Sequence, residues 1–185
     1  MQAREHITIL VLGDSLSAGY GLSTSSAWPS LLQQELKTKD ADYTVANASI
    51  SGETSAGGLA RLPALLKKEK PQVLILELGA NDGLRGLPLA NLASNLRNMV
   101  DLAKQEKVKV LLLGMKLPPN YGNYAKEFAF TYQQLAKKTN IAFIPFFLEQ
   151  IAEKPELFQA DGLHPTAAAQ SKILNTILPK LQPLL

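Results

Sequence analysis

The segment ILVLGDSLSAGYG, residues 9–21, decides how the rest of the sequence is interpreted. It begins inside an apolar run, residues 7–12, of the kind found in strands that are buried on both faces of a parallel sheet. Gly13 ends the run, and Asp14 and Ser15 follow in a turn-prone stretch. Because ligands of open α/β sheets bind beyond the carboxyl ends of the strands, Ser15 is a candidate site residue. An ordinary turn serine would give the same local pattern.

Two further apolar runs end in the same way. Residues 43–48 lead to Gly52, and residues 73–78 lead to Gly79 and Asn81. The carboxyl ends of parallel strands share one edge of the sheet, so these residues are expected to meet Ser15 in one crevice. Local sequence alone leaves Gly52 open as a residue needed only for its backbone angles, and Asn81 as an amide that holds a turn.

Helical patterns alternate with apolar runs along the whole chain. This βαβ alternation predicts a five-stranded parallel sheet with helices on both faces. With 185 residues, 46% of them hydrophobic, we expect one domain spanning residues 1–185. Glu77 interrupts the third apolar run, and the pattern gives no reason for it. The expected strands are 7–12, 43–48, 73–78, 108–115 and 141–144, and the expected helices begin near residues 26, 54, 89, 124 and 165.

Composition excludes several classes of protein. The 19 basic and 16 acidic residues leave a net charge of only +3, and the basic residues are scattered, which argues against a nucleic-acid surface. The absence of cysteine excludes disulfides, thiolate metal sites and a cysteine nucleophile. No run approaches the ~20 apolar residues of a membrane span.

The segment DGLHP, residues 161–165, supplies the partners that a serine nucleophile needs. Of the two histidines, His6 is expected at the opposite end of the first strand, so His164 is the candidate general base. Asp161 lies three residues earlier and can turn back to hold one imidazole nitrogen while the other faces Ser15. Pro165 fits the first position of the last helix. A metal site is the weaker interpretation, because the turn lacks a third strong ligand.

The order of these residues excludes the usual α/β-hydrolase pattern, which needs a Gly-x-Ser-x-Gly elbow and a widely separated Asp and His. The chain instead resembles the SGNH, or GDSL, hydrolases. The four blocks that carry this resemblance are GDSLS (13–17), Gly52, GAND (79–82) and DGLHP (161–165). Within that family, the segments NASISGETS, GLARLPALL, ELGANDGLRG and LPPNYG resemble bacterial enzymes with thioesterase and lysophospholipase activity.

The resemblance implies a flavodoxin-like three-layer α/β/α sandwich, the SGNH hydrolase fold. It implies a triad of Ser15, Asp161 and His164, and an oxyanion hole formed by the N–H groups of Ser15 and Gly52 and the side-chain amide of Asn81. It implies no cofactor and no metal. Residues 1–6 do not form a signal peptide, so a periplasmic or secreted location is an expectation taken from the family.

The expected function is hydrolysis of carboxylic esters and acyl thioesters through an acyl-enzyme on Ser15. The expected partners are small acyl substrates, lysophospholipids among them, and we expect a monomer. The loop after the fourth strand, with Leu117, Pro118 and Tyr121, is the candidate acyl-chain site. The alternatives are a carbohydrate acetylesterase of the same family and a flavodoxin-like binding module. The module lacks any Gly-x-Gly-x-x-Gly or P-loop pattern.

Overall fold

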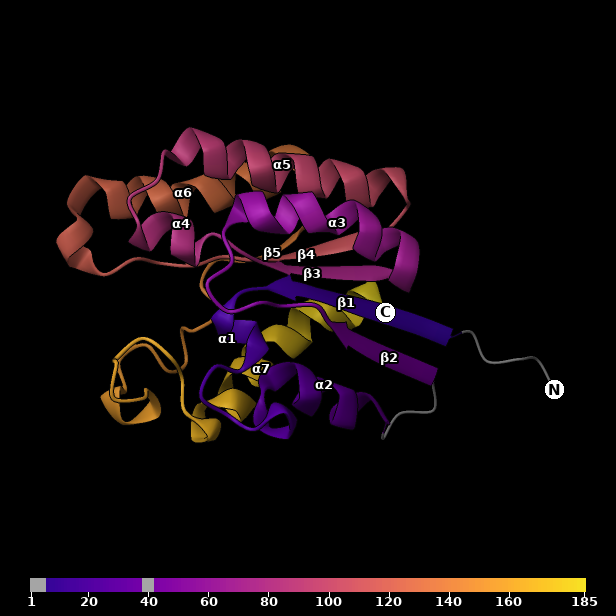
Figure 1. Ribbon diagram of the computed structural model, residues 1–185, viewed down its shortest axis with the longest axis horizontal. Coiled ribbons are helices and arrows are strands. Elements are labelled where there is room, and N and C mark those ends of the chain that lie inside the picture. The colour runs from indigo at the N-terminus through magenta and orange to yellow at the C-terminus, as the bar shows by residue number, and fades with distance from the viewer. Residues whose placement is uncertain (1–5, 38–41) are drawn as a thin grey trace.

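The computed structural model describes residues 6–37 and 42–185. Their central feature is a parallel five-stranded sheet in the order β2-β1-β3-β4-β5 (Figure 1). This order has its switch point between β1 and β3, as in flavodoxin-like folds. The strands are β1 (His6–Gly13), β2 (Asp42–Asn47), β3 (Val73–Glu77), β4 (Lys109–Leu113) and β5 (Ala142–Ile144).

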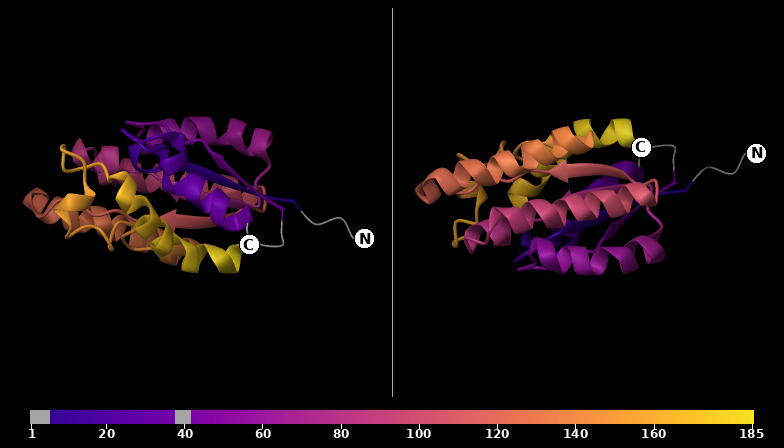
Figure 2. Two further views of the ribbon diagram at one scale, coloured as in Figure 1. Left: turned by 90° about the horizontal axis from the view of Figure 1, so that it is seen from below. Right: turned by 90° about the horizontal axis from the view of Figure 1, so that it is seen from above.

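Helices cover both faces of the sheet and make it a three-layer α/β/α sandwich, as the sequence predicted. Helices α3, α5 and α6 lie on one face, and α2 and α7 lie on the other (Figures 1 and 2). The long helices are α2 (Trp28–Lys37), α3 (Ser55–Glu69), α5 (Leu89–Gln105), α6 (Gly122–Thr139) and α7 (Ala167–Leu181). The short ones are α1 (Ser15–Ala18), α4 (Ala80–Leu84), η1 (Thr24–Ser26), η2 (Pro119–Tyr121), η3 (Pro155–Leu157) and η4 (Gln182–Leu184).

The strand sequences explain this double cover. Successive side chains of a strand point to opposite faces, so an unbroken apolar run needs a core on each side. In β1, Ile9 and Val11 pack with α2 and α7, whereas Leu10 and Leu12 pack with α3, α5 and α6. All four are fully buried. β1 is therefore held on both faces, and its carboxyl end provides a rigid position for the residues that follow.

The start of the last helix differs from the prediction. Pro165 does not occupy the first helical position, because α7 begins at Ala167 with Thr166 as its N-cap. Pro165 instead forms an isolated antiparallel bridge with Phe158. The hydrogen bonds of this bridge come from its neighbours, with Gln159 N donating to His164 O and Thr166 N donating to Leu157 O. Proline, which has no backbone N–H, fits at position 165 because the hydrogen bonds of the bridge use no donor from this residue.

Among residues 6–37 and 42–185, no helix is both long enough and apolar enough to span a membrane.

Candidate active site

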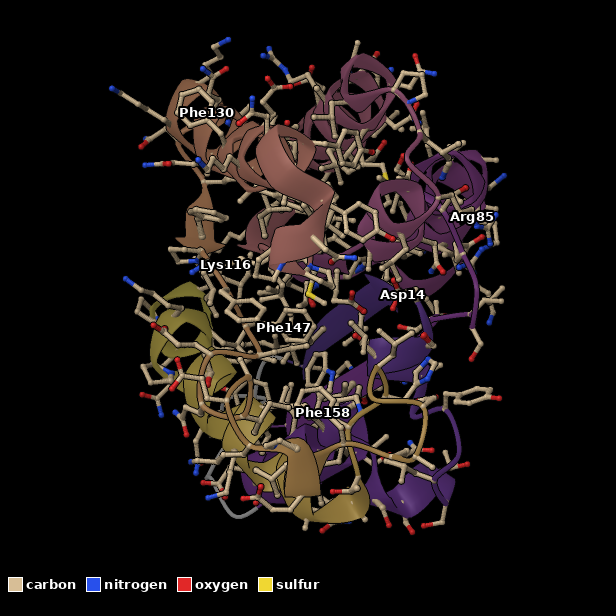
Figure 3. All side chains as sticks on the ribbon, turned by 90° about the vertical axis from the view of Figure 1, so that its left-hand side faces the viewer. Asp14, Arg85, Lys116, Phe130, Phe147 and Phe158 are labelled. Carbon is tan, nitrogen blue, oxygen red and sulfur yellow. The ribbon has the colours of Figure 1, made fainter. Side chains whose placement is uncertain are left out.

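Ser15 is the first residue of α1, directly beyond the carboxyl end of β1. The carboxylate of Asp14 is the N-cap of this short helix and accepts a hydrogen bond from Leu16 N at 3.0 Å. Asp14 is buried and Ser15 is half-buried, so the cap is fixed beneath the site while the hydroxyl faces the crevice. Figure 3 looks onto this edge of the sheet and shows Asp14 between the two helical layers.

His164 and Asp161 lie beside Ser15, as the sequence predicted. The Nε2 atom of His164 is 2.9 Å from Ser15 Oγ, and its Nδ1 atom is 2.6 Å from Asp161 Oδ2. The other oxygen of Asp161 accepts from the N–H groups of His164 and Leu163 at 3.0 and 2.9 Å. The single turn therefore binds the carboxylate through its backbone and orients the ring at the same time. His6 pairs with Asp42 at the opposite end of β1.

These contacts fix the charge of Asp161 and the tautomer of His164. The N–H and imidazole hydrogen bonds from His164, with the N–H of Leu163, lower the pKa of Asp161 to about 2. An ionised carboxylate only accepts, so Nδ1 of His164 carries the hydrogen and Nε2 presents its lone pair to the Ser15 hydroxyl. A hydroxyl, an imidazole and a carboxylate in this order can remove a proton from the serine and hold it.

Two backbone N–H groups at these strand ends have no protein acceptor among the described residues. Within the described part of the chain, neither Ser15 N nor Gly52 N donates a hydrogen bond to another residue. Gly52 has φ = +80°, a conformation that disfavours any side chain, and its carbonyl accepts from Arg85 Nη2 at 3.2 Å. The two N–H groups are thus available to an anionic oxygen.

Asn81 comes to this crevice from the third strand end, as the resemblance implied. Its Nδ2 atom donates to Glu53 O at 2.9 Å and lies 3.2 Å from Asp14 Oδ2. The amide therefore links the loop that carries Gly52 to the cap of α1. With both acceptors in place, an oxygen bound in the crevice would share the hydrogen of the longer, weaker bond to Asp14.

The turn before Asn81 depends on a glycine. Gly79 has φ = +119°, and a Cβ atom there would lie 2.1 Å from Tyr132 Oη. The Tyr132 hydroxyl donates to Leu78 O at 2.8 Å from its buried position on α6. The tyrosine and the glycine together fix the point at which α4 leaves the sheet.

Asp82 supports the start of α3, and its described hydrogen bonds are to Ser55 rather than to Ser15, Asp161 or His164. Its carboxylate accepts from Ser55 N at 2.8 Å and from Ser55 Oγ at 2.6 Å, and so caps the start of α3. The N-cap residue is Thr54, but its side chain makes no capping bond, because the buried Asp82 carboxylate satisfies the helix end instead.

Sequence reasoning missed two residues that contact the triad turn. The Tyr20 ring packs on the His164 imidazole, with ring centroids 4.4 Å apart, although Tyr20 is 52% exposed. Gln159 Nε2 donates to Tyr20 O at 2.8 Å and to Pro165 O at 3.0 Å. Tyr20 lies three residues after the end of the GDSLS block, but Gln159 belongs to no pattern that marks it.

The loop predicted to bind acyl chains lies beside α4. Leu117 is buried, and a Cβ atom on Gly83 would meet its Cδ2 at 2.9 Å. Tyr121 donates from its hydroxyl to Leu84 O at 3.0 Å, and Pro118 is exposed. A pocket of about 520 Å³ next to the loop is lined by Lys116, Leu117, Pro119, Gly122, Asn123, Ala125, Lys126 and Ala129. Leu117 therefore contributes to both the pocket and the support of α4.

Comparison with known proteins identifies the family of this chain. A family model described as GDSL-like Lipase/Acylhydrolase matches residues 11–172. The chain is 53% identical to esterase TesA of Pseudomonas aeruginosa over 96% of this chain and 89% of that protein. It is 46% identical to thioesterase 1/protease 1/lysophospholipase L1 of Escherichia coli K12, over 96% of this chain and 84% of that protein.

The fold comparison gives the same answer. A crystal structure of TesA superposes with a TM-score of 0.94 at 53% sequence identity, covering 96% of this chain and 99% of that chain. The family model begins within β1, at residue 11, ends within α7, at residue 172, and includes all four sequence blocks. This chain belongs to the GDSL-like lipase/acylhydrolase family.

Proposed function

We propose that this protein is a serine esterase and thioesterase that hydrolyses carboxylic esters and acyl thioesters through an acyl-enzyme on Ser15. The observation that carries the proposal is the aligned contact from Ser15 Oγ to His164 Nε2 and from His164 Nδ1 to Asp161. It lies at a strand end that also presents free N–H groups. The relatives named esterase and thioesterase support the same chemistry.

In the acylation step, Ser15 Oγ attacks the acyl carbon while His164 Nε2 takes the hydroxyl proton. The carbonyl oxygen gains negative charge, which the N–H groups of Ser15 and Gly52 and the amide of Asn81 would stabilise. Asp161 stays ionised and stabilises the imidazolium. When the tetrahedral intermediate collapses, the C–O or C–S bond breaks, and His164 returns the proton to the leaving alcohol or thiol.

In the deacylation step, a water molecule replaces the serine as nucleophile. His164 removes a proton from this water and then returns one to Ser15 Oγ as the acid leaves, so the enzyme recovers its starting state. The side chain of His164 is half-buried, with 20% of it accessible, which leaves room for the water.

The function is tested with nitrophenyl esters from acetyl to palmitoyl and with the matching acyl thioesters of coenzyme A. We expect turnover of both ester and thioester substrates, with medium or long chains preferred over acetyl. Turnover of acetyl sugars alone would favour the carbohydrate acetylesterase. Absence of turnover on every substrate would contradict the proposed function.

Activity is expected to fall as the pH is lowered, because His164 must be neutral to accept the Ser15 proton. With its pKa lowered to about 2, Asp161 remains ionised in mild acid, so protonation of Asp161 does not cause this loss. The measurement is kcat across mildly acidic to alkaline pH, with melting curves at each value to exclude acid unfolding. A flat profile would contradict the role of His164 as base.

Leu117→Ala is expected to lower kcat/KM for long-chain esters roughly 4- to 15-fold, because each lost methylene contact costs ~0.8 kcal/mol. Acetyl esters are expected to change much less. The matched control is Phe130→Ala on α6, an exposed aromatic residue outside the pocket (Figure 3). Equal losses for short and long chains would show that Leu117 acts only by supporting α4.

We further propose lysophospholipids as substrates, a monomeric state, and a periplasmic or secreted location. A relative named lysophospholipase supports the first. A site composed of residues from one chain is compatible with the second. The location rests on the family resemblance. Release of fatty acid from lysophosphatidylcholine and the elution volume on a calibrated column test the first two.

A further inference from the structure

Glu77 is the charged residue that the strand pattern left unexplained, and it lies beneath the nucleophile. It ends β3 directly opposite Gly13 of β1 in the sheet register. A Cβ atom on Gly13 would lie 2.6 Å from Glu77 Oε2, so the missing side chain makes room for the carboxyl group. Glu77 is only 2% exposed. A buried carboxyl group that a glycine accommodates needs polar partners to offset its desolvation.

Within residues 6–37 and 42–185, the hydrogen-bond partners of the Glu77 side chain belong to the turn that carries Ser15. Its Oε2 atom accepts from Ser17 Oγ at 2.7 Å and from Asp14 N at 3.2 Å. Its side chain also hydrogen-bonds the carboxyl group of Asp14, which is 1% exposed. Two carboxyl groups in contact away from water cannot both be ionised, so the pair shares one proton.

The proton belongs on Glu77, because both described donors to Glu77 reach Oε2 and leave Oε1 to carry the hydrogen, whereas each oxygen of Asp14 accepts a hydrogen bond. Asp14 Oδ1 accepts from Leu16 N at 3.0 Å, and Asp14 Oδ2 lies 3.2 Å from Asn81 Nδ2. An ionised Asp14 satisfies both donors, and the protonated Glu77 supplies a third. The contacts therefore run from Glu77 through Asp14 to the amide that is proposed to stabilise the oxyanion.

We propose that Glu77 is a positioning residue that, as a neutral acid, donates a hydrogen bond to the Asp14 carboxylate and so fixes the acceptor that orients Asn81. This inference rests on the proposed function, because orientation of Asn81 matters only if the site stabilises an oxyanion. Glu77 touches no reacting atom. It acts by holding the Asp14 carboxylate in the position from which Oδ2 accepts from Asn81 Nδ2 and so orients the Asn81 amide toward Ser15.

The electrostatic surroundings support this distribution of charge. Burial and the nearby Asp14 raise the pKa of Glu77 well above its usual range. Burial also raises the pKa of Asp14, to about 6, while the Leu16 N–H, Glu77 and His164 oppose that rise. The other ionisable groups that face the pair are Asp82 of α4 and Tyr132 of α6. At neutral pH, Asp14 is thus ionised and Glu77 holds the proton.

A double-mutant cycle with Asn81→Ala tests the route through Asn81. Glu77→Leu removes the hydrogen bond to Asp14, and we expect it to lower kcat about 10- to 100-fold, less than loss of the oxyanion donor itself, with KM within about twofold. In the Asn81→Ala background, the same change is expected to cost less than about threefold, because the residue it positions is gone. Equal losses in both backgrounds would overturn the proposal.

Glu77→Gln tests whether a neutral side chain at position 77 is enough to position Asp14. This variant also keeps the proposal testable if Glu77→Leu fails to fold. The glutamine amide can donate to Asp14 and accept from Ser17 and Asp14 N, so kcat is expected to stay within about threefold of wild type. The matched variant is Asp14→Asn, whose amide N–H₂ would face the donor of Asn81 or of Leu16 N. We expect its kcat to fall far more than that of Glu77→Gln. A Glu77→Gln loss as large as that of Glu77→Leu would overturn the assignment.

Urea unfolding across pH provides a measurement that does not depend on activity. The folded protein keeps the Glu77 proton above the pH at which an unfolded glutamate, with a pKa near 4.5, loses it, so stability falls as the pH rises. From about pH 5 to 8, the unfolding constant of wild type relative to Glu77→Gln is expected to rise by up to about tenfold per pH unit. A ratio that stays constant with pH would overturn the proposal. If the ratio of unfolding constants changes with pH but wild type hydrolyses no ester, the proposed function is wrong. The assignment of the proton to Glu77 is then still supported.

Discussion

Replacing Ser15 by alanine is expected to lower kcat for ester and thioester hydrolysis roughly 10⁴- to 10⁶-fold, the range for loss of a triad nucleophile. The described hydrogen bond of Ser15 Oγ is to His164, so little else in the structure depends on this hydroxyl. The melting temperature should therefore stay within about 2 °C of wild type, as for other changes outside the core.

Two further variants complete this experiment. His164→Ala is expected to cost about as much as Ser15→Ala, because the two residues act as a unit, and the double variant should be little worse than either. Ser25→Ala is the matched control, an exposed serine on η1. Substantial turnover by Ser15→Ala would assign the chemistry to another group.

Replacing Asn81 by alanine is expected to lower kcat roughly 10²- to 10³-fold with little change in KM, because the amide stabilises charge that exists only in the transition state. The variant also removes the donor to Glu53 O, which should cost about 1 kcal/mol of unfolding free energy. Steady-state kinetics and melting curves, measured together, separate the two effects.

Asn81→Asp sharpens the test of the same amide. A carboxylate at this position would face Asp14 Oδ2 and the carbonyl of Glu53, and it would repel the oxyanion, so the loss should equal or exceed that of Asn81→Ala. Asn91→Ala, an exposed asparagine on α5, is the matched control. Full kcat in Asn81→Ala would leave oxyanion binding to the backbone of Ser15 and Gly52.

The sheet was predictable because its strands carry a strong and simple signal. Residues 7–12 and 73–78 are nearly continuous apolar runs, and β1 and β3 occupy these positions within one or two residues. Helix ends were less predictable, as Pro165 shows. A proline suits the first turn of a helix and an isolated bridge equally well, and only the contact with Phe158 decides between them.

The arrangement of Ser15, Asp161 and His164 was predictable because Asp161 and His164 lie within one turn and only one histidine can reach Ser15. The contacts that support it were not. Tyr20 stacks on the imidazole, and Asp82 caps α3, through pairings between segments far apart in the chain. No local pattern encodes such contacts, because they depend on how the strand ends meet in space.

The sequence marked Glu77 as unusual but did not reveal its partner. A charge inside an apolar run conflicts with the pattern of a buried strand, and such conflicts often mark functional positions. The sequence could not reveal its partner, because Asp14 lies on another strand end and Gly13 admits the carboxyl group only through the β1–β3 register. The anomaly was visible, and the explanation needed the structure.

Covalent labelling tests the central claim, a nucleophilic Ser15 activated by His164, most directly. The protein is incubated with a fluorophosphonate and examined by intact mass and peptide mapping, alongside Ser15→Ala, His164→Ala and Ser25→Ala. The expected result is one adduct per chain, located on Ser15, absent from Ser15→Ala, much slower to form in His164→Ala and unchanged in Ser25→Ala. An adduct on another residue, or ester turnover that survives complete modification of Ser15, would contradict the mechanism.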